Sequence, residues 1–346
     1  MLLTHETTIV LNKNDANIVG HMCYAAYKLW NVCNYERNNY KNLGLEKYPD
    51  WYYQKSKHKD DLWFKSLPSQ TAQEICKLLD KSWKSFYRLK ESGGIGNPGS
   101  PRYKKDKMPI TYMQNGIQHE KGSFKVRLSL PKKLKEYMVH TYDIRAAYLY
   151  LKNPVFSNMD IIKQIKIYPP ANDGTSRILV IYEVEDVLPE EDNGHYLSID
   201  LGLHNLMTCY DNAGKTFIIG REYLSLSYFY NKEIARVQSQ WGRIQAAREM
   251  EDLKTSKHLQ KLYRKKNNCI KDYIHKMTRY ITNYSVKNDI HTVVIGDIKG
   301  IRKEKNLGRK TNQKLHSLPY ARIYMQLEYK LKMKGICLIR QEESYS

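Results

Sequence analysis

The run HYLSIDLGL, residues 195–203, decides how the rest of the chain is interpreted. Leu197 to Ile199 form a short apolar run, which predicts a buried strand. Asp200 follows directly, and a carboxylate beside an apolar strand is costly unless a metal ion or hydrogen bonds hold it. The residues therefore predict either a functional acid carried on a strand or a structural aspartate held by hydrogen bonds.

The residues after this acid predict an antiparallel meander. Residues 205–210 and 215–219 are strand-like runs, and Asp211 to Gly214 predict the turn between them. A strand-borne acid followed by a meander is typical of RNase H-like nuclease folds. Further along, the pattern predicts helices at 228–247, 254–284 and 319–334 and strands at 292–297 and 336–341.

The first half of the chain predicts helices and a small β structure. Residues 7–11 predict a strand, a helix follows to about Tyr40, and a second helix begins at Ser69. The run GGIGNPGSP at 93–101 predicts a linker because glycine and proline break regular elements. Strand-like runs separated by turns then predict a small β-barrel or sandwich: residues 110–113, 124–130, 161–168 and 178–184.

The composition of the 346 residues points to a polyanionic partner. The chain has 57 Lys+Arg against 36 Asp+Glu, a formal net charge of +21. Its 29 tyrosines suit stacking on bases. A low-GC coding bias would explain part of the tyrosine count, but it does not create so large a charge.

Several other classes of protein are excluded by pattern. The sequence has no apolar run of membrane-helix length and no signal-peptide pattern, so we expect a cytoplasmic, nucleoid-associated protein without membrane contact. Its six cysteines form no CxxC pair, which predicts no zinc site and no disulfides. No Walker-type glycine loop and no HExxH motif are found.

Basic residues gather at three places that could contact phosphates. The outer face of the 254–284 helix carries almost no acid, which favours a nucleic-acid backbone as its counterpart. A solvated helix face is the alternative for any single lysine. The candidate binding residues are Lys77 and Lys84 on the second helix, Arg102 and Lys104 after the linker, and Lys257, Lys261, Arg264, Lys265 and Lys266 on the long helix.

These motifs together resemble the TnpB family, the RNA-guided nucleases (OrfB) encoded by IS200/IS605-class transposons and related to type V CRISPR effectors. The matching motifs occur in family order along essentially the whole chain. They are PSQ at 68–70 with WKSF at 83–86, GSPRYK at 99–104, SIDLGLHNL at 198–206, YNKEIAR at 230–236, His275-Lys276, and QEESY at 341–345.

The resemblance implies a multidomain α+β fold. Residues 1–12 and 96–192 would form a wedge-type β-barrel, 13–95 an inserted helical recognition lobe, and 195–346 an RNase H-like (RuvC) α/β domain that lacks its zinc ribbon. A noncoding guide RNA would be the cofactor. Target double-stranded DNA with a short adjacent motif would be the partner, and Gln73 and Thr111 occupy positions where contacts to that motif fall.

The resemblance also implies an acid set for two-metal DNA cleavage, and here the chain departs from the family. Asp200 matches the first acid, but Gly296 occupies the usual place of the second. In some branches of the family that acid lies on the next strand, where Glu342 or Glu343 would supply it. The Tyr-Thr-Ser motif, zinc ribbon and final Asp of the family are absent, so we expect a C-terminally truncated chain that binds Mg²⁺ weakly at Asp200, and not productively.

Two functions follow as expectations. The first is an RNA-guided DNA-binding protein that is nuclease-deficient and represses transcription by occupying its target, like the TnpB-derived nuclease-dead repressors. The alternative is a transposon-associated RNA-guided DNA endonuclease, an Mg-dependent enzyme seen without its C-terminal part. A decaying pseudogene product and an RNA-binding protein that regulates its own guide transcript also remain open.

Overall fold

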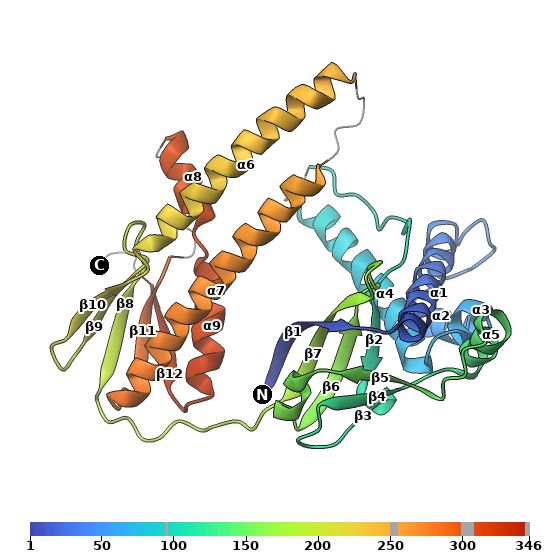
Figure 1. The fold of residues 1–346 in the computed structure, drawn as a ribbon, viewed down its shortest axis with the longest axis horizontal. Helices are drawn as coiled ribbons and strands as arrows, with labels where there is room; N and C mark the ends of the chain where they lie inside the picture. Colours follow the sequence, from blue (N-terminus) through green and yellow to red (C-terminus); the bar gives the residue numbers. More distant parts are fainter. Residues whose placement is uncertain (94–95, 250–254, 299–307, 343–346) are drawn as a thin grey trace. The chain divides into compact units, whose positions relative to one another are not determined.

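The computed structural model divides the chain into two compact units, residues 1–185 (unit 1) and 186–346 (unit 2) (Figure 1). The structure describes residues 1–93, 96–249, 255–298 and 308–342. Each unit has its own hydrophobic core.

Unit 1 contains the helices expected in the first half of the chain and three that the pattern did not predict. Asn12 begins α1 by accepting a hydrogen bond from the Asp15 amide at 2.8 Å, and Gly93 ends α4 in a left-handed conformation, φ 63°. The helices are α1 (Lys13–Asn38), α2 (Trp51–Lys57), α3 (Leu62–Lys65), α4 (Ser69–Ser92) and α5 (Lys132–Tyr142).

The strands of unit 1 form two sheets. The first is antiparallel, in the order β1-β7-β6-β2, and the second is β3-β4-β5. Short 3₁₀ helices, η1 (Gln114–Gly116) and η2 (Pro154–Asn158), interrupt the strands. The strand bounds are β1 (Leu2–Val10), β2 (Ile110–Met113), β3 (Ile117–His119), β4 (Lys125–Ser129), β5 (Tyr148–Lys152), β6 (Ile161–Ile167) and β7 (Thr175–Glu183).

The residues that the structure describes form no closed β-barrel, so of the predicted barrel or sandwich the barrel is wrong. The η1 turn separates β2 from β3, and β3, β4 and β5 pair only with one another, so the ladder never closes. The apolar faces of both sheets instead contribute to one core, with Val126 and Leu151 from one sheet and Ile165 and Val180 from the other. Closure requires pairing between distant strands, which local alternation does not reveal.

A buried polar cluster joins three helices of unit 1. Arg37 on α1 donates to Gln54 on α2 at 2.9 Å and pairs with Asp80 on α4 at 3.0 Å. Glu36 accepts from Lys57 at 2.5 Å and lies 3.3 Å from the ring of His58. Because each buried charge has a partner, the cluster fixes how these helices pack rather than leaving uncompensated charge.

Unit 2 has the strands and the meander that the sequence predicts. Its sheet runs β10-β9-β8-β11-β12, with β8, β11 and β12 mutually parallel and β9 and β10 antiparallel. The strands are β8 (Tyr196–Asp200), β9 (Met207–Asp211), β10 (Thr216–Ile219), β11 (Thr292–Asp297) and β12 (Cys337–Glu342), and the helices are α6 (Glu222–Ala247), α7 (Lys257–Lys287), α8 (Arg309–Ser317) and α9 (Tyr320–Lys332).

One face of this sheet is covered and the other is open. Leu197, Ile199 and Val293 on the covered face belong to a core that includes Ile281 of α7 and Leu327 of α9. Side chains alternate along a strand, so Tyr196, Ser198 and Asp200 of β8 project from the opposite face. The fold therefore presents Asp200 away from the core, at the carboxyl end of its strand.

Candidate nucleic-acid interface and acidic site

The register of the sheet determines which residues share a face with Asp200. Asp200 pairs with Thr208 of β9, and Gly296 of β11 pairs with Gln341 of β12. The β8–β11 ladder pairs Ile199 with Ile295, so the next step brings Gly296 beside Asp200. The exposed carboxylate of Asp200 thus lies in a row with a threonine, a glycine without a side chain, and a glutamine.

The acids one step further along the ladder project from the other face. Asp297 pairs with Glu342, one residue beyond the row that contains Asp200. Because successive side chains point to opposite faces, neither acid joins Asp200 on the open face. Of the two candidates for the relocated acid, Glu342 is therefore displaced from Asp200, and Glu343 lies outside the described residues.

The donor set of this row fits Mg²⁺ poorly. Two-metal cleavage of a phosphodiester needs several carboxylates around paired cations, and the described part of the row offers the Asp200 carboxylate alone. Across residues 1–93, 96–249, 255–298 and 308–342, no group of three His, Cys, Asp or Glu side chains is placed to hold a metal ion.

Gly202 explains the sharp path of the chain after the acid. A Cβ atom at this position would lie 2.8 Å from the Asn205 carbonyl oxygen, closer than real contacts allow. The Gly202 amide hydrogen-bonds the same oxygen at 3.2 Å. The glycine therefore permits the tight loop between β8 and β9 that leaves Asp200 at an open strand end.

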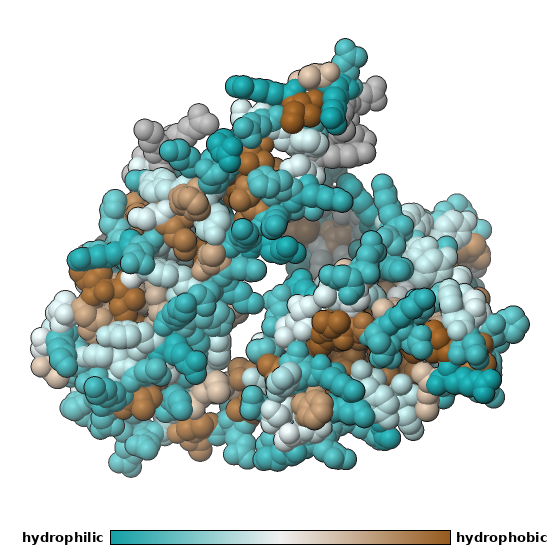
Figure 2. Space-filling model, in the orientation of Figure 1, coloured by the Kyte–Doolittle hydropathy of each residue, from teal (hydrophilic) through white to brown (hydrophobic). Residues whose placement is uncertain are grey.

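The outer face of α7 bears the basic residues that the sequence predicts, with one exception. Lys257, Lys261, Arg264 and Lys265 are exposed, and hydrophilic residues cover much of the face over α7 in Figure 2. Lys266 instead donates to Asn231 of α6 at 2.6 Å, and burial lowers its pKa. The prediction that Lys266 lies on the outer face is therefore wrong, because α6 packs on that side of the helix.

The segment after the linker is bound to α1 through its backbone. Asn34 donates to the Pro101 carbonyl at 2.9 Å and Trp30 to the Arg102 carbonyl at 3.2 Å. Asn31 both donates to and accepts from the backbone of Lys104, at 2.9 and 2.8 Å. The Lys104 ammonium lies 4.6 Å from the Trp30 ring centroid, and the Arg102 side chain is exposed.

The candidate residues on α4 already have partners within unit 1. Lys77 pairs with Glu74 at 2.8 Å, and Lys84 pairs with Asp80 at 2.8 Å. Gln73 contacts the Ser69 hydroxyl at 3.3 Å. Thr111 lies half-exposed on β2, beside Lys166 of β6 in register.

An aromatic and basic surface on the β4–β5 pair was not predicted from the sequence. The Lys125 ammonium lies 3.9 Å from the Tyr150 ring centroid, and the Arg127 guanidinium 4.4 Å from that of Tyr148. Both tyrosines are exposed, whereas Leu149 between them and Leu151 after them are buried. The alternation in KVRLS at 125–129 and YLYLK at 148–152 was the available signal, since one face of each strand is apolar and the other aromatic or basic.

Comparisons with known proteins agree with the family that the motifs indicate. Residues 179–302 match the family OrfB_IS605, described as a probable transposase, which confirms the TnpB-type resemblance. No curated protein matches the chain. No helix in the described part of the chain is both long and apolar enough to cross a membrane.

Two solved structures that match the chain are complexes of Cas12f, a TnpB relative. The structure of the Cas12f1–sgRNA–target DNA complex matches with a TM-score of 0.58 and 14% identity, over 96% of this chain and 73% of that one. The CRISPR–Cas12f ternary complex gives a TM-score of 0.33 and 16% identity, over 94% and 70%. The first match shows that this chain shares the Cas12f fold.

Proposed function

We propose that this TnpB-type chain binds double-stranded DNA under the direction of a noncoding guide RNA and does not cut it. It would occupy its target beside a short adjacent motif and repress transcription there, in the cytoplasm and on the nucleoid. The similar Cas12f1 structure is a complex with guide RNA and target DNA, which supports the same partners for this chain.

The proposed loss of cleavage rests on one observation, which is that Gly296 lies beside Asp200. An acid at Gly296 would share the open face with Asp200 and could hold a cation between the two strands. Gly296 offers no ligand, and the nearest acids in the ladder project from the other face. Without a second carboxylate, the developing charge at a scissile phosphate would lack its main source of stabilisation.

Binding is supported by charge that the fold leaves exposed. The α7 outer face, the Arg102–Lys104 segment and the β4–β5 pair all carry cations at the surface. Contacts between these cations and phosphates would release counterions, so affinity should fall steeply with salt. None of these surfaces requires the acids of the cleavage site.

A second function, RNA-guided cleavage of DNA, is favoured by the retention of Asp200 itself. An exposed carboxylate at the end of β8, with Thr208 and Gln341 in its row, retains part of a metal site. Glu343 would then have to supply the missing acid. The Asp200→Ala substitution separates the two functions, because it removes the acid without touching the basic surfaces.

The test begins with the RNA that copurifies with the full chain. Sequencing it identifies the guide, and a duplex matched to that guide is then mixed with the complex in Mg²⁺. We expect a gel shift without cleavage, the same shift with Asp200→Ala, and no shift with a duplex whose target sequence is scrambled. Guide-dependent cleavage that Asp200→Ala abolishes would establish the endonuclease instead.

A further inference from the structure

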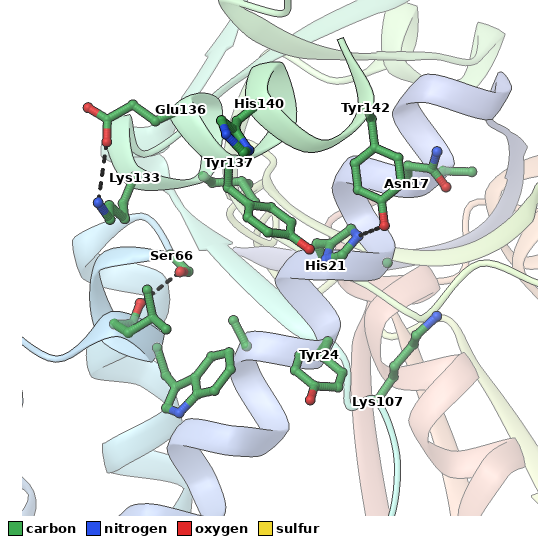
Figure 3. A pocket seen from close by; sticks show the side chains of 16 residues that line it. Asn17, His21, Tyr24, Ser66, Lys107, Lys133, Glu136, Tyr137, His140 and Tyr142 are labelled. Carbon is green, nitrogen blue, oxygen red and sulfur yellow. Dashed lines mark hydrogen bonds and ion pairs between the residues drawn. The ribbon is translucent and has the colours of Figure 1, made fainter. Parts of the chain in front are cut away.

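Unit 1 contains a cavity of about 780 Å³ between α1, α3 and α5 (Figure 3). This volume lies in the range of pockets that hold small ligands or single nucleotides. Asn17 and Tyr24 line it from α1, Ser66 from the end of α3, and Tyr137 and His140 from α5. None of these residues belongs to the acid site or to the basic surfaces described above.

Aromatic rings stand on two sides of the cavity. Figure 3 shows Tyr137, His21 and Tyr142 close together, with Tyr24 on the other side. The His21 ring centroid lies 5.1 Å from that of Tyr137, and its Nε2 atom is 3.1 Å from the Tyr142 hydroxyl. On the other side, the ring centroids of Tyr24 and Trp63 lie 5.7 Å apart.

These rings are not simply part of the hydrophobic core. Tyr137 is 45% exposed and Tyr142 45% exposed, although both line the cavity. A stacked pair of rings in a core would be covered on both faces, whereas here part of each ring remains accessible to a planar ligand. The cavity therefore offers aromatic surface that unit 1 does not itself bury.

The cations at the cavity suit a ligand that carries phosphate. Lys107 and Lys133 line the wall, and Lys133 lies 3.5 Å from its one acidic neighbour in the lining, Glu136. Burial, and then the charge of Lys107, lower the pKa of His21, which favours the neutral ring. Neutral His21 can hydrogen-bond a polar edge while the lysines attract an anion.

We propose that this cavity receives one unpaired nucleobase of a single-stranded nucleic acid, stacked on Tyr137, with Lys107 attracting its adjoining phosphates. The inference rests on the proposed function for the source of the strand, which would be either the guide RNA or the displaced DNA. Unpaired bases are commonly bound by stacking on exposed aromatic side chains beside cations. The aromatic rings, neutral polar groups and two lysines of this cavity match that chemistry.

The test measures stacking directly with short single strands. The full chain is titrated into RNA and DNA pentamers that contain 2-aminopurine, whose fluorescence is quenched when the base stacks. We expect quenching by the natural chain, and affinity about 5- to 150-fold weaker for Tyr137→Ala, the usual effect of removing one stacking ring. The RNA and DNA arms identify which strand supplies the base.

Two further variants distinguish a loss of the binding pocket from a loss of folding. Ser66→Trp fills the cavity without removing an aromatic wall, and it should abolish the quench. Tyr35→Ala removes an exposed tyrosine of α1 outside the cavity and should leave quench and affinity unchanged. Circular dichroism of each variant checks that unit 1 remains folded.

The outcomes separate this inference from the proposed function. A chain that shifts its guided duplex but does not quench either pentamer would overturn the nucleobase pocket alone. Quenching that survives both Tyr137→Ala and Ser66→Trp would also overturn it. If the natural chain copurifies without guide RNA but quenches a pentamer, and both variants abolish that quenching, the nucleobase pocket would be supported and guided binding would be contradicted.

Discussion

In unit 1, helices α1 and α4 bury charged residues, whereas the charged residues of the candidate site in unit 2 are exposed. Arg37 and Asp80 are almost fully buried and pair with each other. Asp200 and the cations of the α7 outer face lie at the surface. Buried charges need partners to be tolerated, whereas exposed charges persist without them. The comparison indicates that the buried charges of unit 1 serve packing, whereas the exposed charges of unit 2 remain available to an external partner.

The largest expected effect comes from breaking the buried pair. Asp80→Ala would leave Arg37 charged and buried, and we expect unfolding to become easier by about 3–5 kcal/mol. Urea unfolding followed by tryptophan fluorescence measures this, because Trp30, Trp51, Trp63 and Trp83 lie in unit 1.

The matched control for this prediction is Asp200→Ala, which removes an exposed acid of unit 2. We expect its effect on the free energy of unfolding to stay within about 0.5 kcal/mol. A large loss of stability from Asp200→Ala would mean that Asp200 is a structural acid, and it would remove the contrast between the two units.

The next effect concerns nucleic-acid affinity and the exposed cations of α7 in unit 2. Replacing Lys257, Lys261, Arg264 and Lys265 together by alanine should reduce the slope of log affinity against log salt by up to about four, since each cation would neutralise one phosphate. Filter binding between about 50 and 300 mM KCl measures the slope. The control replaces Lys41, Lys47, Lys55 and Lys59 of unit 1, and an equal reduction there would show that the effect reflects net charge alone.

A smaller effect is expected from pH on the unit 1 cluster. Burial alone would raise the pKa of Glu36, but hydrogen bonds from His58, Lys57 and Gln54 bring it down to about 2. A carboxyl with a lowered pKa adds stability above its unfolded value of about 4.5, and this is lost as the pH falls toward 2. The free energy of unfolding, measured by urea at pH 5 and pH 3, should therefore fall.

The variant Glu36→Gln should flatten that dependence and cost about 1–3 kcal/mol at pH 7, since His58 and Lys57 lose a charged partner. Glu46→Gln, at an exposed position of unit 1, is the control and should keep the natural dependence. An unchanged pH profile in Glu36→Gln would mean that other acids dominate acid unfolding.

The smallest effect is expected at the exposed end of the same ion network. Lys84 forms an ion pair with Asp80, and the Lys84 side chain is 72% exposed to solvent. Exposed ion pairs contribute little, so Lys84→Ala should change the free energy of unfolding by less than about 1 kcal/mol. The same urea experiment measures it, and a loss as large as that of Asp80→Ala would contradict the division between buried and exposed charge.

Local patterns predicted much of the fold of unit 2. The apolar run before Asp200 and the run ending at Asp297 are strands in the expected places. The turn at Asp211 to Gly214 lies between β9 and β10, as expected. Alternation along β11 places Asp297 on the other face from Asp200. These features depend on residues a few positions apart, which is the information that a single sequence carries most clearly.

Long-range features escaped prediction for a physical reason. Three features depend on residues distant in sequence. They are the separation of the unit 1 strands into two sheets, the pairing of β4 with β5 and the packing of Lys266 against α6. Helix α5 and strand β5 were missed because tyrosines and lysines on their exposed faces diluted the apolar pattern. The pocket against α5 could not be anticipated without that helix.

The hydrogen bonds between α1 side chains and the backbone of residues 101–104 affect which substitutions this segment can accept. Its anchors are main-chain carbonyls and one main-chain amide, so the path of the segment does not depend on which side chains it bears. Substitutions at Arg102 and Lys104 should therefore be tolerated without loss of the local backbone path. A randomised library at these two positions, sorted by thermal melting, should retain most members at the natural melting temperature.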